Sequence, residues 1–279
     1  MAITQFIPTV WSETLYTQLD KQYIGVANCN RDFEADVKEK GSIIRVAGVG
    51  SVDVGNYYSG SDLDTPQDLS DTSIDIEVNQ AKYFNFQIDD IDKAQSSPKL
   101  MSAAMKMAAD SLSNEADKYV YSLYNDAAHV VEELAVSEDN VIDALIKART
   151  KLYQSGVSDA NDIVIEVSPT IAEFILKAKI NLGTDNTAAL ENGCIGNIGG
   201  CKIFVSNNIH TSYDSSTKIY HHKCIARTKR AVAFVEQLSE ITAYRPEKRF
   251  ADAVKGLYLF GACVVYNNEM VLLDFGMPN

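Results

Sequence analysis

The spacing of hydrophobic residues is helical near the start of the chain. Trp11, Leu15, Leu19 and Tyr23 recur every four residues, which predicts a helix within an N-terminal arm. The polar stretch that follows, residues 28–40, offers this helix little to bury. We therefore expect the arm, residues 1–40, to need something else to pack on.

From residue 41 to about residue 88 the hydrophobic period is two. Ile74, Ile76 and Val78 alternate with polar residues, as in a half-exposed strand, and a β-rich run precedes them at residues 43–54. The polar, turn-rich residues 55–71 lie between the two runs, so the pattern predicts a long β-hairpin with a loose tip. This segment has seven acidic residues, one Arg and no Lys between Gly41 and Ala81. It has too little apolar surface to fold alone, and we expect it to lie against a neighbour.

The clearest predicted element is a helix from Pro98 to about Asn125. Ser97 is a suitable N-cap, and Pro98 fits the first helical turn. One apolar stripe follows at spacings of four and three: Leu100, Ala104, Ala108, Leu112, Ala116, Tyr119 and Leu123. The opposite face carries Lys106, Asp110, Ser113 and Asp117. A helix of roughly 40 Å is typical of a structural spine.

The remaining residues predict a compact α/β lobe followed by a return to strands. Ser137 is expected to cap a helix that ends near Gly156, and a strand at 163–167 leads into Ser168-Pro169, where a further helix begins and runs to Gly183. A flexible Gly-rich loop, 193–200, is expected before short strands at 202–206, 217–221 and 231–237. The terminal strands are expected at 241–245, 254–266 and 270–273.

Composition narrows the class of protein. The 279 residues are 46% hydrophobic, which is enough for a sizeable core, and the formal net charge is −13. Such a charge repels nucleic-acid phosphates on average, so any contact with DNA has to be local or indirect. The sequence contains neither an apolar run of about 18 to 20 residues nor a signal-peptide pattern at its start, so we expect a soluble cytosolic protein. The five scattered cysteines indicate reduced, buried thiols.

Three clusters resemble chemical sites, and each has a simpler structural interpretation. His221, His222 and Cys224 have metal-binding side chains, but adjacent strand residues point to opposite faces and no second ligand pair matches them. The Gly-rich loop lacks the Lys-Ser/Thr and the helix of a phosphate-binding loop. Asp89, Asp90 and Asp92 lack calcium-loop spacing, and acidic residues also suit the start of the long helix.

These patterns do not favour an enzyme. No catalytic motif is present, and His129 and His210 have no local partners for a triad. A metal-dependent phosphohydrolase that uses Asp89, Asp90 and Asp92 is the alternative from another class, and it predicts a small oligomer with bound metal. We otherwise expect no cofactor and no metal.

Basic residues cluster late in the chain, in two groups. One contains Arg227, Lys229 and Arg230, and the other contains Arg245, Lys248 and Arg249. Both are small for DNA-binding patches in so acidic a chain. They are complementary to the acidic hairpin, as expected for a head-to-tail contact between identical subunits, although two independently solvated faces are an equal alternative.

The order of these parts resembles the HK97-fold major capsid proteins of tailed bacteriophages over nearly the whole chain. The most specific similarity is the run from Arg230 to Gln237, through Ile241 to Phe250, to Val254–Val265, which resembles the family's strands returning to the peripheral lobe. The resemblance implies an α+β fold with an N-arm (1–40), an E-loop (41–80), a P-domain with a spine helix (81–130) and return strands (240–279), and an A-domain (131–239).

The family also implies a function and partners. Pentamers and hexamers would form an icosahedral virion shell around double-stranded DNA, assembled in the host cytoplasm with a portal protein and without a membrane. The chain starts directly with the arm, so we expect a separate scaffolding protein in place of a cleaved N-terminal segment. Since the E-loop has no lysine, we expect no covalent linkage between subunits there. An encapsulin, a protein-filled shell of the same fold, is the structural alternative.

The assembly hypothesis names specific residues. The arm and hairpin are expected to bury their apolar residues on neighbouring subunits, and the acidic hairpin is expected to meet a basic patch there. The candidate interface residues are Trp11, Tyr57, Tyr58, Asp62, Asp64, Arg245, Lys248 and Arg249.

Overall fold

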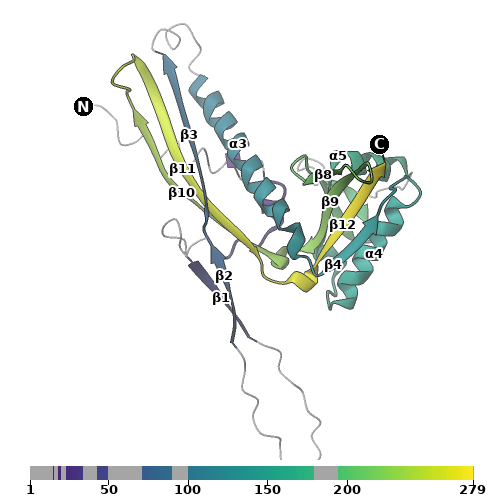
Figure 1. Cartoon of the computed structure of the whole chain (residues 1–279). Coiled ribbons are helices and arrows are strands. Elements are labelled where there is room, and N and C mark those ends of the chain that lie inside the picture. The colour runs from purple at the N-terminus through teal and green to yellow at the C-terminus, as the bar shows by residue number, and fades with distance from the viewer. Residues whose placement is uncertain are drawn as a thin grey trace, which may run out of the picture.

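The protein has an elongated body and a compact body, which meet at an angle (Figure 1). The computed structural model describes residues 15, 18, 19, 23–33, 43–49, 71–89, 100–178 and 194–278, and side chains within these ranges are described except at 47–49, 71–72, 100–102 and 238–240. A two-stranded hairpin base extends from the elongated body. The arrangement is mixed α and β, as the sequence predicted.

The elongated body consists of a three-stranded antiparallel sheet and one long helix. The sheet order is β10 (Val232–Tyr244), β11 (Ala251–Val264) and β3 (Gln80–Asp89), and helix α3 (Leu100–Ser122) lies along it. The sequence predicted two strands where β10 forms one, with an irregularity between Leu238 and Glu240. At 1.5 Å per residue, the 23 residues of α3 span about 35 Å. The expected spine helix is therefore present, and its predicted start at Pro98 lies outside the described residues.

The buried face of α3 differs from the predicted stripe. The buried apolar residues are Met105, Ala109, Leu112, Ala116 and Val120, whereas Ala104 and Ala108 are half-buried. Ser113 and Asp117, which the periodicity placed on the exposed face, are also buried. The prediction was wrong because alanines on several faces give two stripes of similar strength, and the choice depends on what packs against the helix.

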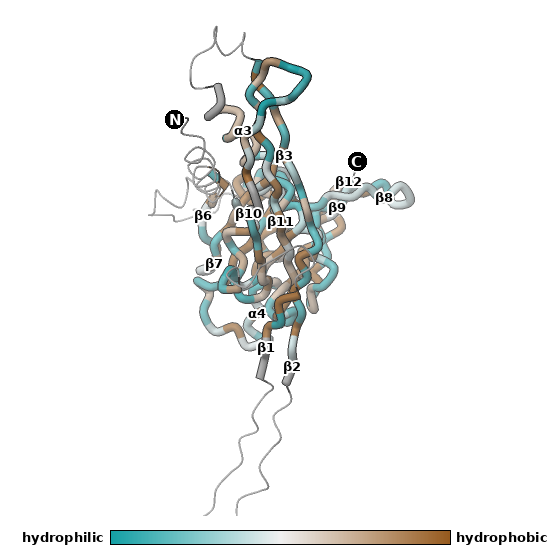
Figure 2. The backbone as a smooth tube through the Cα atoms, turned by 90° about the vertical axis from the view of Figure 1, so that its left-hand side faces the viewer, coloured by the Kyte–Doolittle hydropathy of each residue, from teal (hydrophilic) through white to brown (hydrophobic). Residues whose placement is uncertain are grey.

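The compact body is built on a seven-stranded sheet. Its order is β4 (His129–Glu133), β12 (Met270–Pro278), β9 (Ile219–Thr228), β5 (Ile163–Val167), β7 (Cys201–Val205) and β6 (Cys194–Ile198), and β8 (Thr211–Asp214) also pairs with β9. Strand β4 is parallel to β12, and β5 is parallel to β7. The hairpin of β8 and the start of β9 extends from the side of this body (Figure 2).

Two helices of the compact body follow the predicted periodicity. In α4 (Val141–Gln154), Val141, Leu145, Ala148 and Leu152 are buried, as predicted. Its N-cap is Asn140 and not Ser137, whose backbone N–H instead donates to the Asn140 side chain. Helix α5 (Pro169–Lys177) begins as predicted, since the Ser168 hydroxyl accepts a hydrogen bond from the Ile171 N–H.

The expected flexible Gly-rich loop is a strand followed by a tight turn. Residues 194–198 form β6, and Gly199 and Gly200 connect it to β7. Both glycines have positive φ angles, 58° and 91°, which suit a two-residue hairpin turn and strain other residues. The loop prediction was wrong because the cross-strand pairing with β7 orders the segment.

The described base of the predicted hairpin consists of β1 (Ile43–Val49) and β2 (Asp71–Glu77). These strands are antiparallel, with Ile44 opposite Ile76, and the predicted alternation is confirmed because Ile76 and Val78 are buried while Asp75 and Glu77 are exposed. The buried side chains pack on the three-stranded sheet at Ala233, Val235 and Leu259. The predicted tip lies outside the described residues.

Short 3₁₀ turns complete the described elements. The turns are η1 (Val26–Asn28), η3 (Leu123–Asp126), η4 (Ala160–Asp162), η5 (Lys229–Ala231) and η6 (Asn267–Glu269).

The sequence grouped residues 240–279 as return strands of one domain, but hydrogen bonding divides them between the two sheets. Strand β11 stays in the three-stranded sheet, and β12 pairs with β4 and β9.

Candidate assembly surfaces

The arm segment, residues 23–33, is fixed between the two bodies by a buried ion pair. Arg227 on β9 donates to both carboxylate oxygens of Glu166 on β5, at 2.9 and 3.1 Å, and neither side chain is exposed. The same guanidinium donates to the backbone carbonyls of Gly25 and Asn28, each at 2.8 Å. Arg227 is therefore no part of a surface basic patch, which corrects the expectation from the sequence.

A second buried carboxylate holds the same segment on the three-stranded sheet. Glu236 on β10 accepts hydrogen bonds from Tyr23 at 2.5 Å, from Arg31 at 2.6 Å and from Tyr258 on β11. Desolvation and the negative charge of Glu236 raise the pKa of Tyr23, so its hydroxyl remains a donor. Asn30 also forms backbone hydrogen bonds with Val232 and Phe234.

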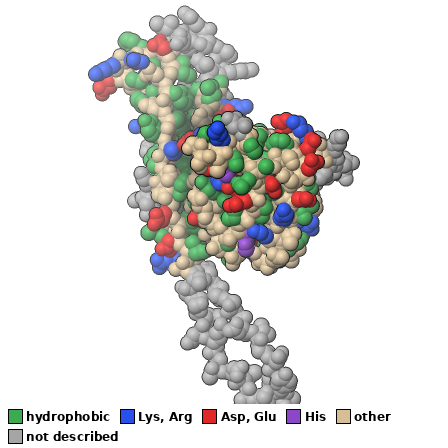
Figure 3. All heavy atoms as spheres, turned by 45° about the vertical axis from the view of Figure 1, so that its right-hand side comes forward, with side chains coloured by type: hydrophobic (Ala, Val, Ile, Leu, Met, Phe, Trp, Pro, Cys, Tyr) green, Lys and Arg blue, Asp and Glu red, His purple; other side chains and the backbone are tan. Residues whose placement is uncertain are grey.

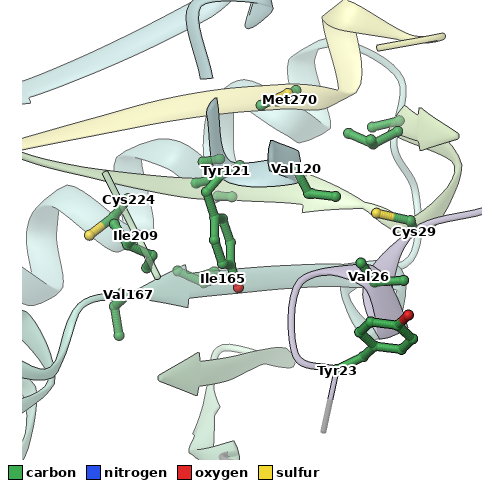
Figure 4. Close-up of a cluster of buried hydrophobic side chains, with 14 of the residues drawn as sticks. Tyr23, Val26, Cys29, Val120, Tyr121, Ile165, Val167, Ile209, Cys224 and Met270 are labelled. Atoms are coloured by element: carbon green, nitrogen blue, oxygen red, sulfur yellow. The ribbon is translucent and has the colours of Figure 1, made fainter. Parts of the chain in front are cut away.

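The described part of the arm buries its apolar residues within its own chain. Leu15, Leu19, Tyr23 and Val26 all belong to the main core cluster. Figure 4 shows Val26 and Cys29 of the arm in the same cluster as Tyr121 of α3 and Ile165 of β5. The expectation that the arm cannot bury such residues within one subunit is wrong for these positions, because the two bodies form a joint that receives them. Trp11 lies outside the described residues.

The second basic cluster lies at one end of the elongated body. Arg245, Lys248 and Arg249 belong to the β10–β11 turn, residues 245–250, together with Phe250, which is 84% exposed. Arg245 forms an exposed ion pair with Asp252 at 3.1 Å. Figure 3 shows basic and acidic side chains together at this end. The structure thus brings the three predicted cations into one exposed turn.

The hairpin base points toward the opposite end of the molecule. Strands β1 and β2 extend away from the three-stranded sheet, and the β10–β11 turn lies at its far end (Figure 1). In the base, Arg45 pairs with Asp75 across the strands at 3.0 Å, and this hydrogen bond lowers the pKa of Asp75. The acidic candidates Asp62 and Asp64, with Tyr57 and Tyr58, lie outside the described residues.

Between these ends, the elongated body carries exposed apolar groups that the sequence interpretation missed. Tyr83 on β3 is 78% exposed and lines a groove of about 320 Å³ with Thr242, Lys255 and Leu257. The Lys255 ammonium lies 5.5 Å from the ring centre of Tyr244. On the helix side, Met107 is 70% exposed beside Phe84 and Phe86. The available signal in the sequence was the alternation of Phe84, Phe86 and Ile88 with polar residues, which is typical of a strand.

Several of the residues that resembled chemical sites make contacts within the fold. His221 and Lys223 contact Asp274 at 2.9 and 2.6 Å, whereas Cys224 is fully buried. His129 contacts the Ser155 hydroxyl at 2.8 Å, and His210 stacks on Tyr124.

Neither a metal site nor a membrane span is found in the described part of the chain. Asp89 ends β3, while Asp90 and Asp92 lie outside the described residues. Across the described ranges, no three His, Cys, Asp or Glu side chains gather as a metal site would require. Among the helices described, none has the length and hydropathy needed to cross a membrane.

Solved structures of other proteins share this architecture. No protein-family model matches the sequence, and no curated protein matches it. A solved structure from Mycobacterium phage Che8 is 25% identical, with a TM-score of 0.69 over 90% of this chain and 91% of that chain. The capsid of Ralstonia phage GP4 is 10% identical, with a TM-score of 0.70 over 94% and 91%. A virus-like particle from Pyrococcus furiosus is 12% identical, with a TM-score of 0.58 over 98% and 100%.

These similarities extend over both bodies, since each covers at least nine-tenths of the chain. They show the HK97-like fold of phage capsid proteins and confirm the fold class that the sequence predicted.

Proposed function

We propose that this chain, which has the HK97-like fold, is the major capsid protein of a tailed bacteriophage. Its copies form the pentamers and hexamers of an icosahedral shell around double-stranded DNA. The observation that carries this proposal is the fold match over nearly the full length of capsid structures. The role is structural and not catalytic. Expression with the neighbouring genes of its genome, followed by negative-stain microscopy, should give closed shells, and small metal-containing oligomers would contradict the proposal.

The domain roles follow the two bodies. We assign the spine helix and three-stranded sheet to the P-domain, the seven-stranded sheet to the A-domain, residues 41–80 to the E-loop and residues 1–40 to the N-arm. The strand pairing supports moving two boundaries. Strand β10, from Val232, belongs with the P-domain, and β12 belongs with the A-domain.

The proposed partners fit the charge of the chain. A shell of subunits with net charge −13 encloses packed DNA without binding its phosphates tightly. A separate scaffolding protein and a portal protein complete the assembly in the host cytoplasm. Since residues 41–80 lack lysine, the shells should dissociate into single subunits in hot detergent, and a ladder of linked subunits on a denaturing gel would contradict this.

The contact between subunits is proposed to join the acidic hairpin of one copy to the β10–β11 turn of the next. Arg245, Lys248 and Arg249 supply the positive charge, and Tyr57, Tyr58, Asp62 and Asp64 supply aromatic and acidic groups. The hairpin base and this turn lie at opposite ends of one molecule, so the contact has to be intermolecular. Such a head-to-tail contact forms a ring when the rotation between successive subunits closes, as it does in a pentamer or hexamer. Trp11 is proposed as an additional contact from the arm.

Charge reversal tests this contact. Changing Arg245, Lys248 and Arg249 to Glu should abolish shells in sedimentation and microscopy. The free energy of unfolding in urea should change by only about 0.5 kcal/mol per substitution, as is usual at the surface. The matched control reverses three exposed lysines elsewhere, Lys106, Lys147 and Lys202, and should still form shells. Restoration of assembly by Asp62→Lys and Asp64→Lys in the reversed variant would identify the hairpin as partner. Normal shells from the first variant would refute the contact.

An encapsulin-type shell is the second candidate, because the virus-like particle of Pyrococcus furiosus shares the fold across its whole length. The contents of purified particles separate the two functions. A packaged genome supports the capsid, and enclosed protein without DNA supports the encapsulin.

A further inference from the structure

Among the described residues, the joint between the two bodies contains more buried acid than buried base. Asp117 on α3 and Glu166 on β5 are 1% and 0% exposed, and Arg227 is the guanidinium that lies with them. With both carboxylates ionised, this group of three has a net negative charge. This charge is buried away from water. An uncompensated carboxylate in such a buried position is costly in free energy.

Asp117 holds the arm segment directly. One carboxylate oxygen accepts the Val26 N–H at 2.9 Å, and the other accepts the Ile24 N–H at 3.1 Å. On the far side of the same segment, Arg227 binds the carbonyls of Gly25 and Asn28, and the Asn28 side chain donates to Glu166 at 3.2 Å. The arm segment therefore lies between α3 and the seven-stranded sheet, bonded to both.

We propose that the arm segment is a proton-controlled strap between the two bodies, closed most firmly when Asp117 is protonated and loosened when it is ionised. The strap joins α3 of the elongated body to β5 and β9 of the compact body. Loosening it frees the two bodies to change their relative angle. A subunit that fits both pentamers and hexamers would use such freedom, and this consequence rests on the proposed function.

The surrounding groups agree with this assignment. Among the described residues, Glu166, Tyr121 and Cys29 interact electrostatically with Asp117, and Arg227 is bonded to Glu166. Burial keeps the Tyr121 hydroxyl and the Cys29 thiol neutral by raising their pKa values, that of Cys29 to about 11. Burial, and secondarily the charge of Glu166, raises the pKa of Asp117 to about 6, against the lowering effect of the arm N–H groups. Asp117 therefore takes up a proton near pH 6 in the folded chain.

Hydrogen exchange on the full-length chain tests the strap. The protection factors of residues 24–30, corrected for intrinsic exchange at each pH, should fall about tenfold between about pH 5 and pH 7.5. In Asp117→Asn, which has no carboxyl to titrate, the profile should be flat. The control is Glu115→Gln on the exposed side of the same helix. Lys118 and Lys82 lower the pKa of Glu115, so this variant should keep the tenfold change.

The outcomes decide the proposal without reference to shell assembly, because exchange is measured on subunits whether or not they form shells. A wild-type profile that is flat or rises with pH overturns the strap. An unchanged tenfold fall in Asp117→Asn also overturns it, because another group would then be responsible. Should Asp117→Asn fail to fold, the pH at which the wild-type fall levels off decides: a value near pH 6 supports the strap, and one below about pH 4.5 refutes it.

Discussion

Arg227 and Glu166 form a bidentate ion pair that is completely excluded from solvent, with N–O distances of 2.9 and 3.1 Å. The pair spans β9 and β5 of one sheet, and the remaining guanidinium N–H groups bind the arm. The joint between the two bodies thus depends on a charge pair whose members are both satisfied.

Removal of one partner of this pair should be costly. Arg227→Met leaves the Glu166 carboxylate buried without its counter-ion, and we expect a loss of about 3 to 5 kcal/mol in the free energy of unfolding by urea denaturation. The double variant Arg227→Met with Glu166→Leu should recover part of that loss, because the Glu166 carboxylate that had lost its counter-ion is removed as well. The exposed pair of Arg245 and Asp252 is the comparison, where Arg245→Ala should cost below about 1 kcal/mol. Equal effects at the two sites would contradict this assignment.

The hydroxyl of Tyr23 should contribute to stability by itself. Tyr23→Phe keeps the ring packed on Phe234 and removes the 2.5 Å hydrogen bond to buried Glu236, so we expect a loss of about 2 kcal/mol in thermal or urea unfolding. Tyr213→Phe on the exposed β8–β9 hairpin is the control and should change stability by less than about 0.5 kcal/mol. A neutral Tyr23→Phe would mean that Tyr258 and Arg31 satisfy Glu236 without it.

Gly261 on β11 should control how the hairpin base sits on the sheet. A Cβ there would lie 2.2 Å from the Glu77 carbonyl oxygen, so Gly261→Ala has to displace β2. We expect a loss of about 1 to 3 kcal/mol and faster hydrogen exchange in residues 73–78. Gly156→Ala is the control, because no atom lies within 4 Å of its Cβ position and the cost of about 1 kcal/mol comes from its φ of 96°. Unchanged exchange in residues 73–78 would refute the contact.

Global stability should depend on the protonation of Asp117. Its pKa is about 6 when folded, against an ordinary value of 3.8, so the folded state binds this proton more tightly. The resulting stabilisation is fully present below the ordinary value and is lost as the pH rises through about 6. Between about pH 5 and pH 7, the unfolding free energy of the wild type should fall by about 1.3 kcal/mol relative to Asp117→Asn. An increase over this interval would show that the sign is wrong.

The sequence by itself determined the elements whose signals are local. The apolar spacing of α4, the Ser168-Pro169 start of α5 and the alternation of Ile76 and Val78 were predicted because cap, turn and periodicity depend on residues within a few positions. The order of these elements was also sufficient to indicate the fold class. The positive charge of the β10–β11 turn could be predicted for the same reason, since its three cations are neighbours in the chain.

The tertiary structure alone decided which polar groups are buried. Arg227 and Arg245 look alike in the sequence, yet one is inaccessible and the other exposed, because the Glu166 partner lies 61 positions from Arg227. Asp117 was placed on the wrong face of α3 because its partner, the Val26 N–H, lies 91 positions away. Burial of a charge requires an opposite charge or hydrogen-bond donors in space, and the folding of the arm between the two bodies creates those partners. Periodicity records which side of a helix is apolar, whereas only packing determines where a charge is satisfied.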